Sequence, residues 1–444
     1  MTKKVLMTLL EQKKYKSIHE VLSVYNPVDL AELLETLDAQ NLAVVFRMIE
    51  KEKAAEVFAY MDNDQRQQLI DIFSMEETAE LLDAMSADDA VDFLEDMPAN
   101  VVTHLLEHID WDTRSAINRL LQYPEDSAGS MMTVEFIELH RNMTVRQALD
   151  LIRKIGIDSE TVYTCYVVER HKLEGIVTAK DLMIHDDTVT IAQLMTDQFI
   201  CVHTTDDQEF VANQFRKYGL IAIPVVDSEG CIVGIVTFDD AIDVLTEETT
   251  EDMHKMAAMT SANEESYLKT SVFRHAKNRI VWLMILMFSA TITGTIITRY
   301  EEAFATIPLL VSFIPMLMDT GGNCGSQSST LIIRGLAVGE LRFSDTLKIV
   351  WKEFRVAMLV SIALAAANGV RIFIMYHSAQ MAIVIAASLI LTVVVAKMVG
   401  CLLPIAAKKC RLDPAIMASP LITTIVDTCS IVIYFRIATI IFAL

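Results

Sequence analysis

A repeated pattern of apolar and polar positions runs through the first quarter of the chain. Apolar residues occupy the third, fourth and seventh positions of successive twelve-residue segments, as at Leu33, Leu34 and Leu37. The segments read AELLETL, AVVFRMI, AEVFAYM, QQLIDIF, AELLDAM, VDFLEDM and THLLEHI. This spacing puts the apolar residues on one face of a short helix, which cannot bury that face alone. The pattern therefore predicts a small α-solenoid over residues 1–125, built from single helices or 24-residue helix pairs, with an ordinary helical bundle as the alternative.

After Pro124 the pattern changes to β-α-β, and it occurs twice. The matching segments are MT at 132–133 and 195–196, and GIVTxxD at 175–181 and 234–240. The duplicated region resembles a tandem pair of CBS domains, which implies an α+β fold that senses adenine nucleotides or metal ions. We assign the repeats to residues 126–190 and 191–248. Thr237 and Asp240 fit a ribose-binding pair, but in this position they are more often a helix cap.

The last part of the chain contains five long stretches with few or no charges. They cover residues 280–298, 303–318, 356–375, 381–403 and 414–443. Each is close to the length that crosses a bilayer, so we predict a transmembrane domain of five helices over residues 273–444, joined to the second repeat by a connecting helix at 249–272. Lysines and arginines gather before the first stretch, between the second and third, and between the fourth and fifth. By the positive-inside rule the N-terminal domains are cytoplasmic and the C-terminus is extracytoplasmic.

Charge and cysteine content support this division. Residues 1–268 carry 21 Lys and Arg against 51 Asp and Glu, whereas residues 269–444 carry 16 against 8. So acidic a surface repels nucleic acid and attracts cations, although it also serves simply to keep a domain soluble. Seven cysteines without a C-x-x-C pair argue against a disulfide framework or a zinc site. No P-loop motif is visible, so we expect no nucleotide hydrolysis and no enzyme activity.

Asp427 is the only ionisable residue between Pro414 and Phe435. A charge at mid-membrane costs about 2.5 to 3.5 kcal/mol, so it needs a partner, a cavity or an ion. Thr423 lies one turn earlier on the same helix face, and oxygen ligands of this kind suit a hydrated Mg²⁺. The alternative is that Asp427 pairs with Lys397 or Arg436 inside the bundle. We expect the side chains of Lys397 and Arg436, together with that of Arg371, to extend to the lipid headgroups instead.

A second unusual stretch, MDTGGNCGSQSSTLIIRG at residues 318–335, combines glycines with amides. Gly321, Gly322 and Gly325 allow a close helix approach, while Asn323 and Gln327 present amides on one side. The pattern predicts a non-helical bend beside a wet cavity or, equally, a loop that leads into an interfacial helix.

With these pieces in order, the chain resembles the MgtE family of bacterial magnesium channels and transporters over its whole length. The matching motifs are PMLMDTGGNCGSQSSTLIIRGLAVGE and DPAIMASPLITTIVDTCSIVIYF. The resemblance implies a homodimer in the inner membrane, with the pore between subunits and a connecting helix that closes it when cytoplasmic Mg²⁺ is high. It places Asp427, Thr423 and Ser419 along the pore. Other divalent ions such as Co²⁺ or Mn²⁺, or a sensor without transport, remain alternatives.

The resemblance also implies regulatory Mg²⁺ sites among acidic residues of the cytoplasmic domains. The matching positions are Asp240, Asp243, Glu248, Glu251 and Asp252, with Asp207 and Glu209 as further candidates. In the helical domain we nominate Asp88 and Asp92, which are spaced i, i+4. ATP binding by the CBS pair is a further expectation. Cys324 inside the glycine motif and the methionine-rich segment after residue 252 depart from the family pattern, which affects the expected gating affinity more than the substrate.

Overall fold

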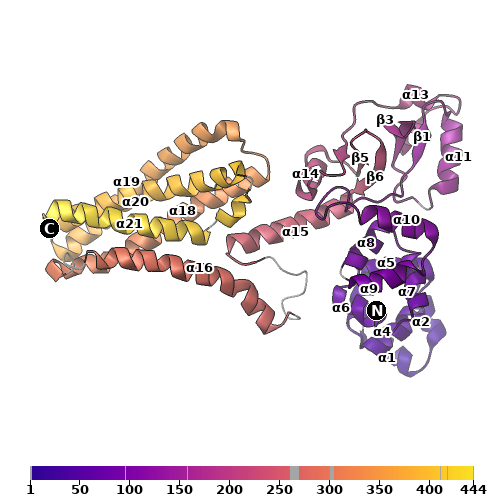
Figure 1. The fold of residues 1–444 in the computed structure, drawn as a ribbon, viewed down its shortest axis with the longest axis horizontal. Helices are drawn as coiled ribbons and strands as arrows, with labels where there is room; N and C mark the ends of the chain where they lie inside the picture. The colour runs from indigo at the N-terminus through magenta and orange to yellow at the C-terminus, as the bar shows by residue number, and fades with distance from the viewer. Residues whose placement is uncertain are drawn as a thin grey trace. The chain divides into compact units, whose positions relative to one another are not determined.

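The computed structural model describes residues 3–95, 97–157, 159–260, 270–300, 305–410, 412–417 and 419–443. The chain divides into two compact units, Met1–Thr246 and Glu247–Leu444, and each is described by itself. Figure 1 shows the ribbon with many of the helices and strands labelled.

Ten short helices open the N-terminal unit. They are α1 Lys3–Glu11, α2 Tyr15–Leu22, α3 Pro27–Glu35, α4 Ala39–Phe46, α5 Lys51–Ala59, α6 Asn63–Ile70, α7 Met75–Leu82, α8 Ala87–Glu95, α9 Ala99–Leu106 and α10 Trp111–Leu120. From α2 to α10 each helix begins twelve residues after the one before it. Polar side chains start several of them: Asp38, Asp62 and Ser74 each accept a hydrogen bond from a backbone N–H in the first turn.

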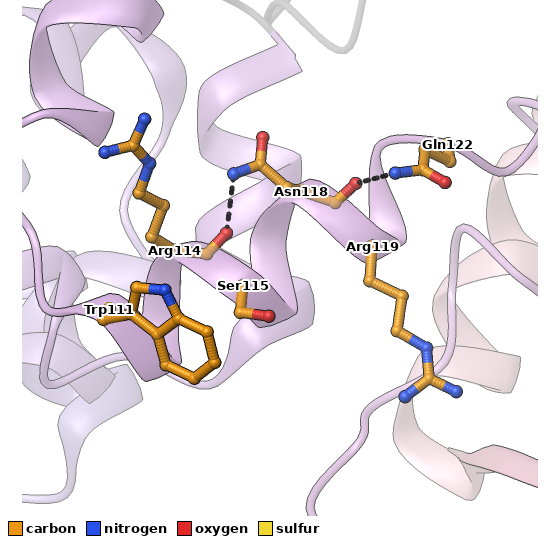
Figure 2. Close-up of a pocket in the computed structure, with 6 residues that line it drawn as sticks. All are labelled: Trp111, Arg114, Ser115, Asn118, Arg119 and Gln122. Atoms are coloured by element: carbon orange, nitrogen blue, oxygen red, sulfur yellow. Dashed lines mark hydrogen bonds between the residues drawn. The ribbon is translucent and has the colours of Figure 1, made fainter.

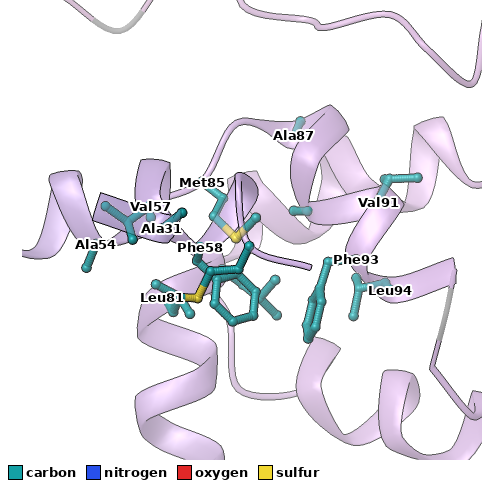
Figure 3. Packing of buried hydrophobic residues seen from close by; sticks show 14 of the residues in the cluster. Ala31, Ala54, Val57, Phe58, Leu81, Met85, Ala87, Val91, Phe93 and Leu94 are labelled. Carbon is teal, nitrogen blue, oxygen red and sulfur yellow. The ribbon is translucent and has the colours of Figure 1, made fainter. Parts of the chain in front are cut away.

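The apolar face of each repeat packs against the repeat two helices away. Helix α3 contacts α5, α5 contacts α7, α7 contacts α9, and the even-numbered helices α4 and α6, and α8 and α10, pair in the same way. Phe58 of α5 and Phe93 of α8 connect the odd-numbered helices with the even-numbered ones, with ring centroids 5.0 Å apart in an edge-to-face arrangement (Figure 3). The 24-residue spacing of the contacts explains why a single repeat has no core of its own.

Two three-stranded sheets follow, one in each duplicated repeat. The first repeat contains β1 Glu138–His140, α11 Val145–Ile155, β2 Thr164–Glu169, β3 Lys172–Thr178 and α12 Ala179–Ile184, and the second contains α13 Ile191–Leu194, β4 Val202–His203, α14 Gln208–Tyr218, β5 Ala222–Val226, β6 Ile232–Thr237 and α15 Phe238–Met256. In both sheets the first strand is parallel to the second and the second is antiparallel to the third.

The repeats exchange short segments, which explains the two sequence matches. Thr133 forms two backbone hydrogen bonds with Ile235 in the sheet of the second repeat, and Thr196 forms two with Ile176 in the sheet of the first. A Cβ at Gly234 would lie 2.7 Å from the carbonyl oxygen of Thr133, so the glycine of the GIVT motif makes room for this crossing backbone.

The second unit is a bundle of long helices. They are α16 Val272–Thr298, α18 Ile314–Ala337, α19 Thr346–Tyr376, α20 Ala379–Lys409 and α21 Ser419–Phe442, with short 3₁₀ turns η1 Pro308–Phe313, η2 Phe343–Asp345 and η3 Pro414–Met417. Helix α20 packs against α18, α19 and α21, and α16 packs against α21. Four of the described helices, α16, α19, α20 and α21, are long and apolar enough to cross a membrane.

Two sequence predictions for this unit are wrong. The predicted span at 303–318 is not one helix in its described part, because η1 ends at Phe313 and α18 begins at Ile314. The glycine motif is neither a bend nor a loop, since α18 is helical throughout from Ile314 to Ala337. Close packing explains the difference: small side chains let α18 approach its neighbours, and this favours a regular helix over a kink.

Candidate functional site

Carboxylates from two distant parts of the sequence meet in the N-terminal unit. Helix α8 contributes Asp88 and Asp92, and the beginning of α15 contributes Asp240. Burial, followed by the charges of Asp89 and Asp240, raises the pKa of Asp88 well above its usual value. Burial and the charge of Asp89 raise the pKa of Asp92 to about 7. The structure therefore brings together three residues predicted from the sequence, and we call them the acidic cluster.

Hydrogen bonds satisfy the acidic cluster only in part. Thr237 Oγ1 donates to Asp240 Oδ2 at 2.6 Å, so Asp240 serves as the expected helix cap. In the described part of the chain, Asp88 Oδ1 is buried without a hydrogen-bond partner. A buried carboxylate oxygen of this kind costs free energy unless a donor or a cation satisfies it. Hard cations such as Mg²⁺ prefer carboxylate oxygens of this type.

Sequence reasoning missed three carboxylates that act on the acidic cluster. Asp89 raises the pKa of Asp92. The pKa of Glu160 is raised to about 7, mainly by burial and in addition by the charges of Asp239 and Asp240. Asp89 and Asp239 are sequence neighbours of predicted residues, so the acidic runs could have revealed them. Glu160 lies in the loop between α11 and β2, and no pattern in its own segment connects it with α8 or α15.

These raised pKa values predict how the stability of α8 and α15 depends on pH. An acid whose pKa is raised in the folded state stabilises the fold below its unfolded pKa of about 4, and that contribution is lost as the pH rises through the folded pKa. Asp240 and Asp92 have folded values of about 6 and about 7. Without Mg²⁺, amide hydrogen exchange in α8 and the first turns of α15 should therefore become faster, beyond the intrinsic pH effect, between pH 5 and pH 8.

The matched controls are two aspartate-to-asparagine variants of the full chain. Asp92→Asn should flatten this pH dependence, whereas Asp64→Asn, at an exposed position in α6, should leave it unchanged. Protection that is the same at pH 5 and pH 8 after correction for intrinsic exchange would contradict the assignment.

Two other predicted regulatory residues lie at the start of α14. Asp207 accepts hydrogen bonds from the backbone N–H groups of Glu209 and Phe210 and so caps the helix. Glu209 lies in the first turn of the same helix. Their role in cation binding stays a prediction.

The last turns of α15 belong to the second unit and carry Glu248, Glu251 and Asp252. Lys255 Nζ lies 2.7 Å from Glu251 Oε1 and 2.7 Å from Asp413 Oδ2, in the segment before α21. Burial and the nearby charge of Asp413 raise the pKa of Asp252. Met256 packs against Ile333 and Ala415. The predicted boundary at residue 248 thus falls inside one continuous helix, and the end of that helix contacts the membrane bundle.

Asp427 lies in α21 beside the glycine motif of α18. The side chains of Asp427 and Thr423 are half-buried, and Asp319 of α18 is close enough for its carboxylate to repel that of Asp427. Asn323 Nδ2 donates to Asp319 Oδ1 at 3.1 Å. Asp319 was not predicted from the sequence, although it opens the glycine motif. The side chain of Ser419 lies outside the described residues, so its predicted place along the pore is not tested.

The structure shows where the three basic residues of the predicted spans lie. Lys397 is only 5% exposed, and its Nζ donates to Ser328 Oγ at 3.1 Å, so neither extension to the headgroups nor pairing with Asp427 applies to it. Arg436 is exposed. Arg371 is exposed as well, and its guanidinium lies 3.4 Å from the sulfur of Met316. The prediction for Lys397 was wrong because a hydropathy profile does not show which face of a helix a charge occupies.

The glycines of α18 bring this helix into contact with α20 and α21. A Cβ at Gly322 would lie 2.9 Å from the Cγ2 of Thr423, and a Cβ at Gly400 of α20 would lie 2.2 Å from the carbonyl oxygen of Gly325. The backbones of α18 and α20 therefore touch at Gly325 and Gly400, and Gly325 also lies against Ile422 of α21.

This contact predicts a large difference between two glycine substitutions in the bundle. Gly400→Ala should lower the melting temperature of the detergent-solubilised protein, with a loss of about 1 to 3 kcal/mol in the free energy of unfolding, because the backbone of α18 cannot move aside without strain. Gly369→Ala is the matched control, since a Cβ there has no neighbour nearer than 3.7 Å. Equal melting temperatures for the two variants would contradict the close approach of α18 and α20.

A hollow of about 530 Å³ on α10 carries none of the predicted site residues. Trp111, Arg114 and Arg119 line it (Figure 2). Asn118 and Gln122, also in the lining, donate to backbone carbonyls of α10 at 2.8 and 3.0 Å, so their amides already serve the helix. Over the ranges that the structure describes, no three His, Cys, Asp or Glu side chains are placed to hold a metal ion together.

Three parts of the chain are similar to known protein families. Family models match three parts of the chain: the MgtE intracellular N domain at residues 25–126, the CBS domain at 128–186 and 191–247, and a divalent cation transporter domain at 314–437. The fold and these matches define a class of membrane transporters for divalent cations that carry CBS domains.

Curated relatives identify the family. The magnesium transporter MgtE of Thermus thermophilus is 35% identical over 335 residues, which cover 75% of this chain and 74% of that protein. The magnesium transporter MgtE of Bacillus subtilis is 34% identical over the same share of each chain. This chain belongs to the MgtE family.

Solved structures match the N-terminal unit. The cytosolic domain of the Mg²⁺ channel MgtE in complex with ATP is 33% identical, with a TM-score of 0.52, and the match covers 55% of this chain and 99% of that one. The soluble part of a magnesium transporter is 28% identical, with a TM-score of 0.53, over 55% of this chain and 97% of that one.

Proposed function

We propose that this protein is a Mg²⁺ channel or transporter of the bacterial inner membrane and not an enzyme. The main support is the position of Asp427, the only carboxylate of the largely apolar helix α21, which lies near a second carboxylate, Asp319, and one turn after Thr423. Two like charges at membrane depth repel each other, and a bound cation offsets both. Relatives named magnesium transporters, of which this chain spans 74%, indicate which cation.

The assembly that we infer is a homodimer with Asp427 of each subunit facing the pore. In this arrangement Thr423 and Ser419 line the path on one side of Asp427, and Asp319 lies at its other side. We infer five spans per subunit, with α18 as the fifth beside the four apolar helices, and an extracytoplasmic C-terminus. A reporter fused to the C-terminus tests this orientation, and cytoplasmic activity of the reporter would contradict it.

We further propose that cytoplasmic Mg²⁺ closes the pore through the acidic cluster and α15. Helix α15 supports this route, because it carries Asp240 in its first turn and Lys255 in its last turn, and Lys255 pairs with Asp413 next to the bundle. The regular spacing of α2 to α10 favours an α-solenoid. ATP binding to the CBS pair is supported by the related cytosolic domain, whose structure contains ATP.

Mg²⁺ uptake by proteoliposomes tests the function directly. We expect uptake that follows the Mg²⁺ gradient without ATP, and that persists when equal concentrations of Co²⁺ or Mn²⁺ are added. Preferred uptake of Co²⁺ or Mn²⁺ would indicate another substrate. The complete absence of cation flux in intact, dimeric protein would favour a sensor that transports nothing.

A further inference from the structure

A buried ionic cluster joins three helices of the bundle. Lys397 of α20 and Glu353 of α19 are 5% and 9% exposed, and Ser328 of α18 is fully buried. Ser328 Oγ donates to Glu353 Oε2 at 2.7 Å, and Lys397 Nζ donates to Ser328 Oγ at 3.1 Å. The direct distance from Lys397 Nζ to Glu353 Oε2 is 3.9 Å, so the serine hydroxyl bridges the two charges.

Stability alone does not account for this cluster. Transfer of two charged groups from water to a buried site costs several kcal/mol for each ion, and apolar residues of similar volume are often as stable or more so. An ion pair differs from apolar packing because it forms in only one register of the helices that carry it. Such a cluster therefore favours one relative position of α18, α19 and α20 over those that are shifted by a turn.

The cluster is one turn from the contacts that hold α21. Gly325, three residues before Ser328, touches the backbone of α20 at Gly400, and a Cβ on it would lie 2.7 Å from Ile422 of α21. Ser329, the next residue after Ser328, donates to the carbonyl oxygen of Met417 just before α21 at 3.4 Å. These contacts leave no space for α18 to move without moving α21.

We propose that Lys397, Ser328 and Glu353 are positioning residues for the transport site. By holding α18 in one register against α19 and α20, they place α21 so that Thr423 and Asp427 meet the ion at the correct distance. The inference rests on the proposed transport of Mg²⁺, but it concerns residues that do not contact the ion. It also gives Lys397, which the sequence assigned to the headgroups, a role inside the bundle.

The test compares single and double neutral variants in proteoliposomes and in detergent. Lys397→Met and Glu353→Gln should each lower the melting temperature, because each leaves a buried charge without its partner. The double variant should regain the wild-type melting temperature. Its half-saturating Mg²⁺ concentration should nevertheless rise by about tenfold, the size of effect expected when a residue acts through packing on a distant site. Lys352→Met, an exposed neighbour of Glu353, is the matched control and should behave as wild type.

Ser328→Ala keeps both charges and provides a second test if the double variant does not fold. It removes the hydroxyl that bridges them, so we expect a smaller fall in melting temperature than in either single charge variant, together with a raised half-saturating Mg²⁺ concentration. Wild-type half-saturation in a folded double variant or in Ser328→Ala would overturn the positioning role and leave a purely structural pair. Absence of uptake by the wild-type protein would overturn the proposed function instead, so the two failures are distinguishable.

Discussion

Asp427→Asn should reduce Mg²⁺ uptake by about a hundredfold while the protein still folds and assembles. The asparagine has nearly the same size and keeps one oxygen, so the packing of α21 beside Gly322 of α18 does not change. What is lost is the negative charge that offsets the dehydration of the ion, and a charged interaction of about 3 kcal/mol corresponds to roughly that factor. Flux of Mg²⁺ into proteoliposomes, with size-exclusion chromatography as the test of assembly, measures the effect.

Two other carboxylate variants serve as the control and the comparison for Asp427→Asn. Glu340→Gln removes an exposed carboxylate beyond the end of α18 and should transport as wild type. Asp319→Asn removes the second carboxylate near Asp427 and should reduce uptake less than Asp427→Asn, because Asp319 is already hydrogen-bonded to Asn323. Mg²⁺-selective flux at the wild-type rate in Asp427→Asn would exclude Asp427 from the pore.

The sequence predicted most of the fold because its patterns are local. The twelve-residue period places one helix in each repeat, and the observed helices begin at that spacing. The matched MT and GIVT segments correspond to the backbone that the two repeats exchange, with Thr133 bonded to Ile235 and Thr196 to Ile176. In both cases a repeated sequence pattern corresponds to a structural unit that the fold repeats.

The features that the sequence did not predict depend on which face of a helix a residue occupies and on contacts between residues far apart in the chain. Hydropathy alone assigned Lys397 to a span end, but its partners, Ser328 and Glu353, lie 69 and 44 positions earlier in the chain. Glu353 lies before the expected span at 356–375, whereas the helix that carries it, α19, already begins at Thr346, ten residues earlier. Glu160 joins the carboxylates of α8 and α15 only because the CBS pair folds back on the helical repeats. No local pattern carries such information.

The second large effect concerns closure of the pore by cytoplasmic Mg²⁺. We expect the triple variant Asp88→Asn, Asp92→Asn and Asp240→Asn to transport Mg²⁺ but to remain open when cytoplasmic Mg²⁺ is high. Each Mg²⁺ that binds only the closed form stabilises it by about 1.4 kcal/mol once the free ion is at about ninefold its Kd. An asparagine oxygen binds a divalent cation far less strongly than a carboxylate, so the variant loses this stabilisation.

The measurement is Mg²⁺ flux into proteoliposomes as a function of the concentration on the cytoplasmic side, with protease sensitivity of the soluble region as a second readout. A control with the same change in charge replaces the exposed residues Asp29, Asp64 and Asp112 with asparagine, and it should close as wild type does. If the acidic-cluster variant closes at the wild-type concentration, the sensor lies elsewhere. If it is closed at every concentration, Mg²⁺ acts only by cancelling the repulsion between α8 and α15, and neutral side chains replace it. Persistent flux would instead mean that the ion bridges the two helices, and that α15 carries this constraint to Lys255 and Asp413 beside the bundle.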